Sequence, residues 1–191
     1  AALLVQAALA VSILLAAPLR LRNLAGLDLR RHLIRTGKGS SRGMRIAIER
    51  HETKNHAVLD YPLPEATVRL LDLYLERYRP LLEPSGSWLF PGRDGKAKNA
   101  NLLSQQIQAA IRRHTGLVVH THLFRHLAGK LSLLLDPGNY EQVRRLLGHQ
   151  SIDTTTIYYT GFATDAAARR YHEQVLQLGE RAAPKRCRRA R

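Results

Sequence analysis

The sequence predicts a mostly α-helical domain with a small antiparallel β-sheet, an α+β fold, and three observations lead to this prediction. Apolar residues recur at helical spacing over much of the chain, for example Leu103, Ile107 and Ile111. Residues 44–50 instead alternate apolar and polar side chains, which is typical of a half-buried strand. The length of 191 residues and the hydrophobic content of 45% allow one sizeable core. We therefore expect one domain over residues 1–180, without internal repeats.

The charge balance indicates the class of partner. The chain carries 30 Lys and Arg against 15 Asp and Glu, a formal net charge of +15. Such an excess favours a polyanion, with nucleic acid first and an anionic membrane second. A basic surface without such a partner is the alternative. Residues 181–191 hold six basic residues and no acidic one, so we expect a disordered tail that binds phosphate nonspecifically.

The composition does not indicate a disulfide framework or a metal site. Cys187 is the single cysteine, which excludes a cysteine zinc site and fits a reducing cytosol. The chain has nine histidines, but no HExxH pattern occurs among them. We expect no metal and no cofactor.

Residues 1–17 are almost wholly apolar, and we expect them to form a buried helix. A signal peptide or a membrane span is the alternative. Gln6 and Ser12 interrupt the apolar run, no basic segment precedes it, and a span needs about 20 residues. Because the chain does not begin with methionine, we expect a fragment or a processed form.

A second, short helix is expected after Pro18, because Leu21, Leu24 and Leu27 have helical spacing. Arg20 stands at the start of this helix, where the helix dipole favours anions. The arginine and the helix end could therefore bind one anion together. In the alternative interpretation, Arg20 is a surface arginine whose stem packs on the helix.

Residues 44–50 and 57–63 are expected to pair as antiparallel strands. The polar turn between them, residues 51–56, carries Lys54 near its tip. A lysine at such a tip is usually just solvated, but a flexible ammonium can also reach a neighbouring site as a proton donor. Pro64 is expected to be the first residue of the next helix.

Two more helices are expected in the second half of the chain. Asn101 is predicted to cap the first, which Gly116 ends. His122 is predicted to open the second, in which His122 and Arg125 share a face at i, i+3 spacing. Four leucines of this second helix are expected to form its buried stripe: Leu123, Leu127, Leu131 and Leu134.

In the last part of the chain, Tyr140, Val143 and Leu147 predict a further helix, with Gly148 expected as its C-terminal cap and His149 just beyond it. Ser151 or Asp153 is expected to start a short segment that ends at Tyr158. A last amphipathic helix is expected over residues 164–178.

Taken alone, each of these groups has an ordinary explanation. A histidine after a helix end is more often a helix-end cation than a catalyst, and paired tyrosines are more often core or interface residues. The ordered combination is more specific than its parts. It resembles the catalytic domain of the tyrosine recombinases, the phage integrase family, from about Ala1 to Tyr159.

Four segments carry the resemblance: APLRLRNLAGLDL, ETKNHAVLDYPLP, HLFRH and LLGHQSIDTTTIYY. They place the catalytic residues that the resemblance implies, which are Arg20, Lys54, His122, Arg125, His149 and Tyr158. Two positions depart from the family pattern. Leu127 stands where many members have a small hydroxyl residue, and Arg22 where a small residue is often found. The family's N-terminal DNA-clamping (core-binding) domain is absent from this chain, so we do not expect target recognition by this chain alone.

The resemblance implies a reaction at one DNA phosphate. Arg20 and Arg125 would stabilise the negative charge of the transition state, because a guanidinium donates paired hydrogen bonds and keeps its charge. His122 would accept the tyrosine proton or orient the phosphate. His149 would donate a hydrogen bond to a non-bridging oxygen, and Lys54 would protonate the departing 5′-oxygen.

Tyr158 is the expected nucleophile, and Tyr159 is its competitor. A shift of one residue on a helix turns a side chain by about 100°, so only one of the two can face the phosphate. The attack would give a 3′-phosphotyrosyl intermediate, which a 5′-hydroxyl of another strand would resolve. Strands would thus be exchanged without ATP or a metal ion.

The expected function is therefore that of a site-specific DNA recombinase or integrase, encoded by a mobile element or serving chromosome resolution. Type IB topoisomerase-like relaxation, a catalytically silent DNA-binding module and a basic membrane-surface protein are the alternatives. The expected partner is double-stranded DNA, bound by a homo-tetramer that exchanges C-terminal helices, without membrane association. The expected location is the cytoplasm of a bacterium, at the nucleoid, for a bacterial or phage-encoded protein.

Overall fold

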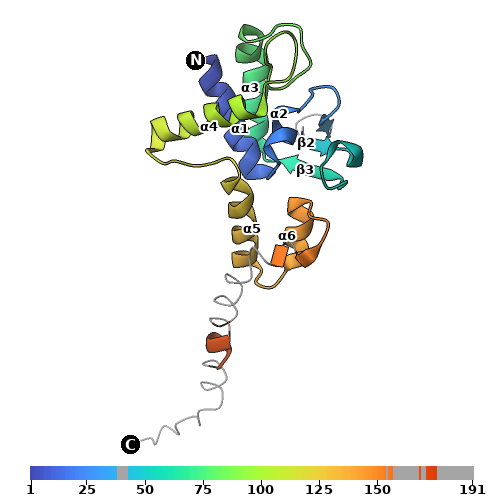
Figure 1. Ribbon diagram of the computed structural model, residues 1–191, viewed down its shortest axis with the longest axis vertical. Helices are drawn as coiled ribbons and strands as arrows, with labels where there is room; N and C mark the ends of the chain where they lie inside the picture. The colour runs from blue at the N-terminus through green and yellow to red at the C-terminus, as the bar shows by residue number, and fades with distance from the viewer. Residues whose placement is uncertain (38–42, 154, 157–167, 169–170, 176–191) are drawn as a thin grey trace, which may run out of the picture.

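The computed structural model describes residues 1–37, 43–153, 155–156, 168 and 171–175, and its helices and small sheet confirm the predicted α+β class (Figure 1). The helices are α1 (Ala2–Ala16), α2 (Leu21–Ala25), α3 (Glu65–Leu73), α4 (Ala100–Thr115), α5 (Leu123–Leu135) and α6 (Tyr140–Leu147). Shorter helical segments are η1 (Arg50–Glu52), η2 (Tyr74–Tyr78) and η3 (Arg79–Leu81). The strands are β1 (Leu33–Thr36), β2 (Gly43–Ile48) and β3 (Leu59–Leu63), in an antiparallel sheet of order β1-β2-β3.

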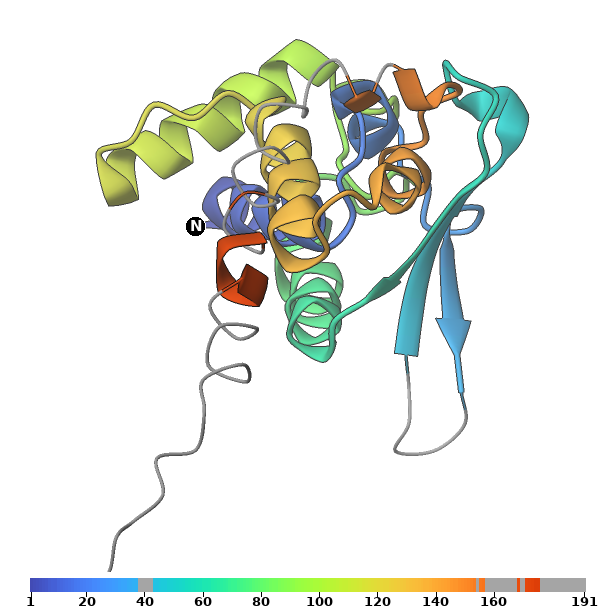
Figure 2. The same ribbon diagram turned by 90° about the horizontal axis from the view of Figure 1, so that it is seen from below.

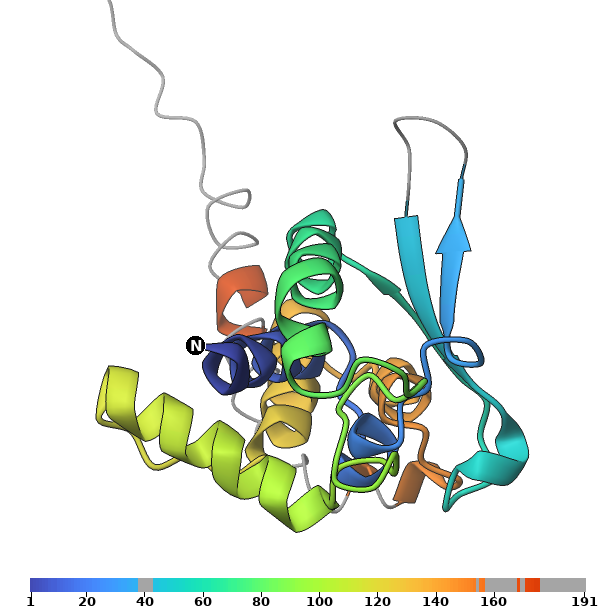
Figure 3. The same cartoon turned by 90° about the horizontal axis from the view of Figure 1, so that it is seen from above.

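The central strand β2 pairs with both neighbours, and Ile46 lies opposite Leu33 of β1 and Tyr61 of β3. The predicted alternation in β2 is confirmed, because its even-numbered residues are buried and its odd-numbered ones are not. Strand β1 was not predicted. Three of its four residues are exposed, so its sequence lacks the alternation that marks a half-buried strand. Figure 3 shows β1 and β2 extending side by side from the helical part of the molecule.

Helix α1 runs through the centre of the helical part, where it packs against α3, α4, α5 and β3 (Figure 2). The predicted burial holds for one side of this helix, on which Leu9 and Ile13 are fully inaccessible. On the other side, Leu4 and Leu15 are 44% and 60% exposed. A helix that is apolar all round has no preferred face, so the neighbouring elements decide which side is covered. Within the described part of the chain, no helix combines the length and the apolar character that a membrane span requires.

The leucine stripe predicted to be buried on α5 is the main correction. Its four leucines lie on the exposed face, where they are 47%, 42%, 48% and 54% accessible: Leu123, Leu127, Leu131 and Leu134. The buried face instead carries Phe124, Arg125 and Leu133. Leu133 packs with Val143 and Leu147 of α6 in a second, small core. The hydrogen bonds of Arg125 and this contact with α6 set the rotation of α5, and helical spacing alone cannot reveal either.

Two predicted helix starts are shifted, and two predicted helix ends are confirmed. The residue that caps α4 is Asn99 and not Asn101, since Asn99 Oδ1 accepts hydrogen bonds from two backbone N–H groups in the first turn of the helix. Pro64 precedes α3 and is not its first residue, because the chain is still extended there after β3. Gly116 and Gly148 end α4 and α6 with φ values of 74° and 59°, the left-handed conformation that glycine adopts readily.

Candidate active site

Arg20 is positioned by the sharp passage from α1 to α2. Leu19, at 1% exposure, anchors this passage in the core, and Arg20 follows in an extended conformation as the residue that precedes α2. The side chain of Arg20 is partly buried. Burial lowers the pKa of this guanidinium, and Tyr61 acts in the opposite direction. The predicted position of Arg20 at the start of a short helix is therefore confirmed.

Arg125 connects the two chain segments that carry Arg20 and His149. It is 5% exposed. Its Nη1 donates to the carbonyl oxygen of Pro18 at 2.5 Å, and its Nη2 donates to that of Leu147 at 2.7 Å. A guanidinium suits this position, because its rigid fork serves two acceptors at once and keeps its charge when buried.

His149 lies just beyond α6, as predicted, and its two ring nitrogens have different partners. Nε2 lies 3.4 Å from Arg125 Nη2, and Nδ1 lies 2.9 Å from the hydroxyl of Thr155. Because a guanidinium only donates, Nε2 must accept, so Nδ1 carries the proton and donates to Thr155. Burial lowers the pKa of His149 to about 4, and the positive charges of Arg125 and Arg20 contribute to the shift.

His122 stands at the start of α5, where the prediction placed it. Partial desolvation lowers the pKa of its imidazole, and neighbouring basic groups lower it further. These neighbours are His126, Arg125 and Arg20. The ring of His126 lies edge-on to that of His122, with a centroid separation of 4.7 Å.

One cavity brings three of the predicted residues together. It has a volume of about 290 Å³, and Arg20, His122 and Arg125 line it along with Thr121 and apolar groups of α1 and α2. Two guanidinium groups and an imidazole thus face one space, although about a hundred residues of sequence separate the first from the others. Such a site is suited to an anion with several acceptor oxygens, such as a phosphate.

Lys54 is exposed on the turn between β2 and β3 and is not among the residues that line this cavity. The turn is nevertheless attached beside His149. Asn55 Nδ2 donates to the Gly148 carbonyl at 3.0 Å, and Gln150 Nε2 donates to the Asn55 carbonyl at 3.1 Å. Figure 2 shows the segment that follows α6 beside this turn.

The predicted nucleophile and its competitor, Tyr158 and Tyr159, lie outside the described residues. So does most of the predicted helix over 164–178, of which residues 168 and 171–175 are described as helical. The predicted tail over 181–191 also lies outside them. Ser151, one of two predicted starts for the segment that leads to Tyr158, accepts a hydrogen bond from the Asp153 N–H at 3.0 Å.

Two residues of the site were missed by sequence reasoning. Tyr61 of β3 donates its hydroxyl to the Leu146 carbonyl at 2.7 Å. Burial raises its pKa to about 12, although the charges of Arg125 and Arg20 act against the shift. Thr155 is completely buried beside His149. Tyr61 stands at an inward position of an alternating strand, which is the one signal that could have identified it.

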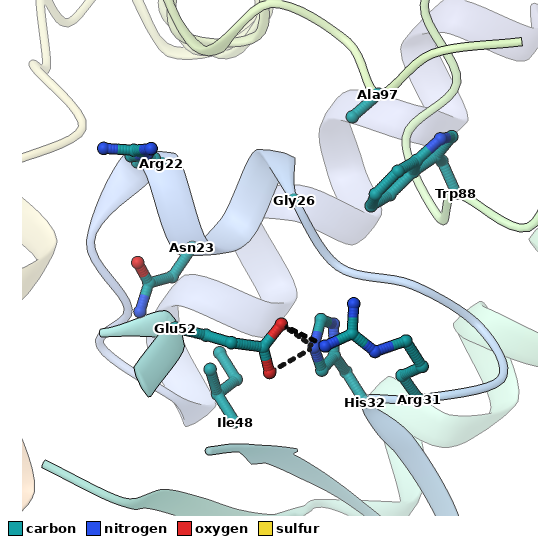
Figure 4. A pocket seen from close by; sticks show the side chains of 9 residues that line it. All are labelled: Arg22, Asn23, Gly26, Arg31, His32, Ile48, Glu52, Trp88 and Ala97. Atoms are coloured by element: carbon teal, nitrogen blue, oxygen red, sulfur yellow. Dashed lines mark hydrogen bonds and ion pairs between the residues drawn. The ribbon is translucent and has the colours of Figure 1, made fainter. Parts of the chain in front are cut away.

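A second polar cluster, shown in Figure 4, supports the start of the Lys54 turn. His32 Nε2 lies 3.1 Å and 3.2 Å from the two carboxylate oxygens of Glu52 in η1. The backbone N–H of Asp28 donates to His32 Nδ1, so Nδ1 is an acceptor and Nε2 is the nitrogen that donates to Glu52. The cavity beside this cluster, about 190 Å³ in volume, also includes Asn23. Within the described ranges, no three His, Cys, Asp or Glu residues are grouped to hold a metal ion.

The chain has relatives among known proteins. Residues 2–164 match the model of the phage integrase family. Tyrosine recombinase XerC of Pseudomonas aeruginosa is 31% identical over 140 residues, which cover 73% of this chain and 42% of that protein. The chain therefore spans less than half the length of this relative.

Solved structures share the fold. The XerH site-specific recombinase bound to difH substrate, in a pre-cleavage complex, matches with a TM-score of 0.63 at 21% identity, over 81% of this chain and 42% of that chain. The XerA recombinase matches with a TM-score of 0.57 at 20% identity, over 89% of this chain and 58% of that one.

Proposed function

This chain belongs to the phage integrase family, and on that premise we propose that it cleaves and rejoins DNA strands as the catalytic part of a site-specific recombinase. One observation carries the proposal: Arg20, His122 and Arg125 line a single cavity, and His149 lies against Arg125. Residues 1–180 would form the catalytic domain and residues 181–191 a basic tail. Further protein segments would supply the recognition of the target site.

In the proposed reaction, the Tyr158 oxygen attacks the scissile phosphorus while the bond from phosphorus to the 5′-oxygen breaks. Arg20 and Arg125 donate hydrogen bonds to the non-bridging oxygens, on which negative charge develops. His122 takes the tyrosine proton, because its lowered pKa keeps the imidazole neutral near pH 7 and so leaves a nitrogen lone pair to accept it. Lys54 gives a proton to the departing 5′-oxygen.

His149 needs a proton on Nε2 to donate to the phosphate, and its two contacts allow this. When a phosphate oxygen takes the place of the Arg125 contact, the imidazole can change tautomer. The Thr155 hydroxyl then donates to Nδ1, since a hydroxyl is both a donor and an acceptor. Two observations support this role: the lowered pKa keeps the imidazole of His149 neutral, and its Nδ1 lies within hydrogen-bonding distance of the Thr155 hydroxyl.

A covalent DNA adduct tests the proposal. The protein is incubated with nicked suicide DNA that carries candidate sites, and adducts are separated on denaturing gels. We expect an adduct that is lost in Tyr158→Phe and retained in Tyr159→Phe. The reverse pattern would assign the nucleophile to Tyr159. Relaxation of supercoiled DNA without strand exchange would favour a topoisomerase-like activity. If neither the wild-type protein nor any variant forms an adduct, a silent DNA-binding module is favoured.

The substrate is proposed to be double-stranded DNA, bound by four copies of the protein that exchange their C-terminal helices. The exposed leucine face of α5 supports such a contact between copies, because an exposed apolar helix face favours a protein partner. The proposed place of action is the bacterial cytoplasm, at the nucleoid. Mass measurement on DNA, with and without residues 164–178, tests the exchange. An unchanged stoichiometry after deletion would rule it out.

A further inference from the structure

The C-terminal end of α6 is held by three separate parts of the chain. The last carbonyl groups of a helix have no partner within the helix and must be satisfied from outside. Here three successive ones accept hydrogen bonds from side chains: Leu146 from Tyr61 at 2.7 Å, Leu147 from Arg125 at 2.7 Å, and Gly148 from Asn55 at 3.0 Å. His149 follows directly, so these bonds also set its position.

The Asn55 bond differs from the other two because it comes from the turn that carries Lys54. Asn55 Nδ2 donates to the Gly148 carbonyl across 93 residues of sequence. Gln150 returns a second bond, from its Nε2 to the Asn55 carbonyl at 3.1 Å. Both groups of Asn55, the side-chain amide and the backbone carbonyl, thus bind the short segment on either side of His149.

The turn itself is held together by local hydrogen bonds. The buried hydroxyl of Thr53 accepts from the Ala57 N–H at 2.9 Å and lies 2.8 Å from the Ala57 carbonyl. The His56 N–H donates to the Thr53 carbonyl at 3.1 Å. A closed turn of this kind fixes the backbone of Lys54 relative to that of Asn55. The attachment of Asn55 to Gly148 therefore also orients Lys54.

We propose that Asn55 is a positioning residue. It holds the turn that carries Lys54 against residues 148–150, so that Lys54 and His149 reach the same phosphate. The inference rests on the proposed function. In that reaction, the bond from the Tyr158 oxygen to phosphorus forms, the bond from phosphorus to the 5′-oxygen breaks, and a proton passes from Lys54 Nζ to that oxygen. Without the Asn55 bond, the turn is displaced and the proton transfer slows, while the arginine site remains intact.

A substrate with sulfur in place of the bridging 5′-oxygen separates this role from a general loss of structure. A thiolate leaves readily without a proton, since thiols have pKa values near 8.5. We expect Asn55→Ala to slow cleavage of the oxygen substrate by about 10- to 100-fold, the cost of a misplaced general acid. The sulfur substrate should be cleaved at a rate within about twofold of wild type, because no proton donor is needed. Asn55→Asp should resemble Asn55→Ala, since a carboxylate cannot donate to the Gly148 carbonyl.

A double-variant cycle and a matched control complete the test. If Asn55 acts through Lys54, Asn55→Ala should have no further effect in a Lys54→Ala background. Asn101→Ala, at an exposed asparagine on α4, should leave both substrates unaffected. Equal slowing of both substrates, or wild-type rates on the oxygen substrate, would overturn the inference.

Amide hydrogen exchange gives a readout that does not depend on activity. We expect Asn55→Ala to increase exchange at residues 53–57 and 148–150 and to leave α4 unchanged. Unchanged exchange in these two segments would refute the positioning role. If the wild-type protein forms no adduct with either substrate while this exchange pattern is found, the proposed function fails and the structural coupling stands.

Discussion

The guanidinium of Arg125 lies 3.4 Å from Nε2 of His149, a contact that disfavours a proton on this buried imidazole. Burial is the main cause that lowers the pKa of His149 from 6.5 to about 4, and the charges of Arg125 and Arg20 add to it. Between these two values, the unfolded chain binds a proton that the folded protein does not. His149 therefore destabilises the folded protein progressively as the pH falls from 6.5 towards 4, and it causes no change of stability with pH above 6.5.

This pH dependence can be measured directly. The urea midpoint of the wild-type protein should decrease as the pH falls from 6.5 to about 4, the two values that bound the shift. His149→Gln, which has no titratable group, should show a shallower decrease over that interval. Parallel curves for the two proteins would contradict the assigned pKa.

The Thr155 hydroxyl should matter for cleavage more than for DNA binding. Thr155→Val keeps the shape of the side chain but removes the partner of His149 Nδ1. We expect adduct formation to slow by about tenfold, the scale for a supporting hydrogen bond near 1.4 kcal/mol, with DNA affinity unchanged. Thr156→Val, on the same segment, is the matched control. Equal effects of the two substitutions would count against a specific role for Thr155.

Arg125 should be essential for stability as well as for chemistry. Arg125→Lys leaves at least one of the Pro18 and Leu147 carbonyls without its donor, because an ammonium cannot replace the fork. We expect a loss of about 2–3 kcal/mol in the free energy of unfolding, measured in urea. Arg22→Lys, at an exposed arginine of α2, should change it by less than about 0.5 kcal/mol. If Arg125→Lys lowers the free energy of unfolding no more than Arg22→Lys does, the two carbonyl contacts do not stabilise the fold.

Gly148 is required for two reasons that a pair of variants can separate. Its φ is 59°, and an added Cβ would lie 2.7 Å from Leu59 Cδ2. At Gly116, φ is 74° but no atom lies within 4 Å of such a Cβ. Gly116→Ala should therefore cost about 1 kcal/mol from the backbone alone, and Gly148→Ala about 2–3 kcal/mol. If the contact with Leu59 contributes, Leu59→Ala should lower the free energy of unfolding less in the Gly148→Ala variant than in the wild-type protein. Equal losses in the two backgrounds would mean that this side-chain contact is absent.

Substitutions on the two faces of α5 should change the free energy of unfolding by very different amounts. Leu133 is 1% exposed, so Leu133→Ala should lower the free energy of unfolding by about 2–4 kcal/mol. Leu131 is 48% exposed, so Leu131→Ser should change it by less than about 0.5 kcal/mol. Urea denaturation of the isolated protein checks both values. A large loss in the free energy of unfolding for Leu131→Ser would mean that the leucine stripe is buried, as the sequence predicted.

Much of the site was predictable from sequence because local patterns mark its elements. Gly148 as a helix end, His149 beyond it and Arg20 at a helix start all follow from rules that involve a few neighbouring residues. The α+β class was equally predictable, since helical spacing and strand alternation are local. Strand β1 was not, because its exposed residues show neither pattern.

What the sequence by itself determined was the order of the candidate site residues and the elements on which most of them stand. The tertiary structure decided the rotation of α5, the convergence of Arg20, His122 and Arg125 on one cavity, and the contacts of Tyr61, Thr155 and Asn55. The physical reason is that these features depend on hydrogen bonds and packing between segments far apart in the chain. Arg125 faces inward, and the leucines of α5 outward, because the Pro18 and Leu147 carbonyls lie on that side of the helix.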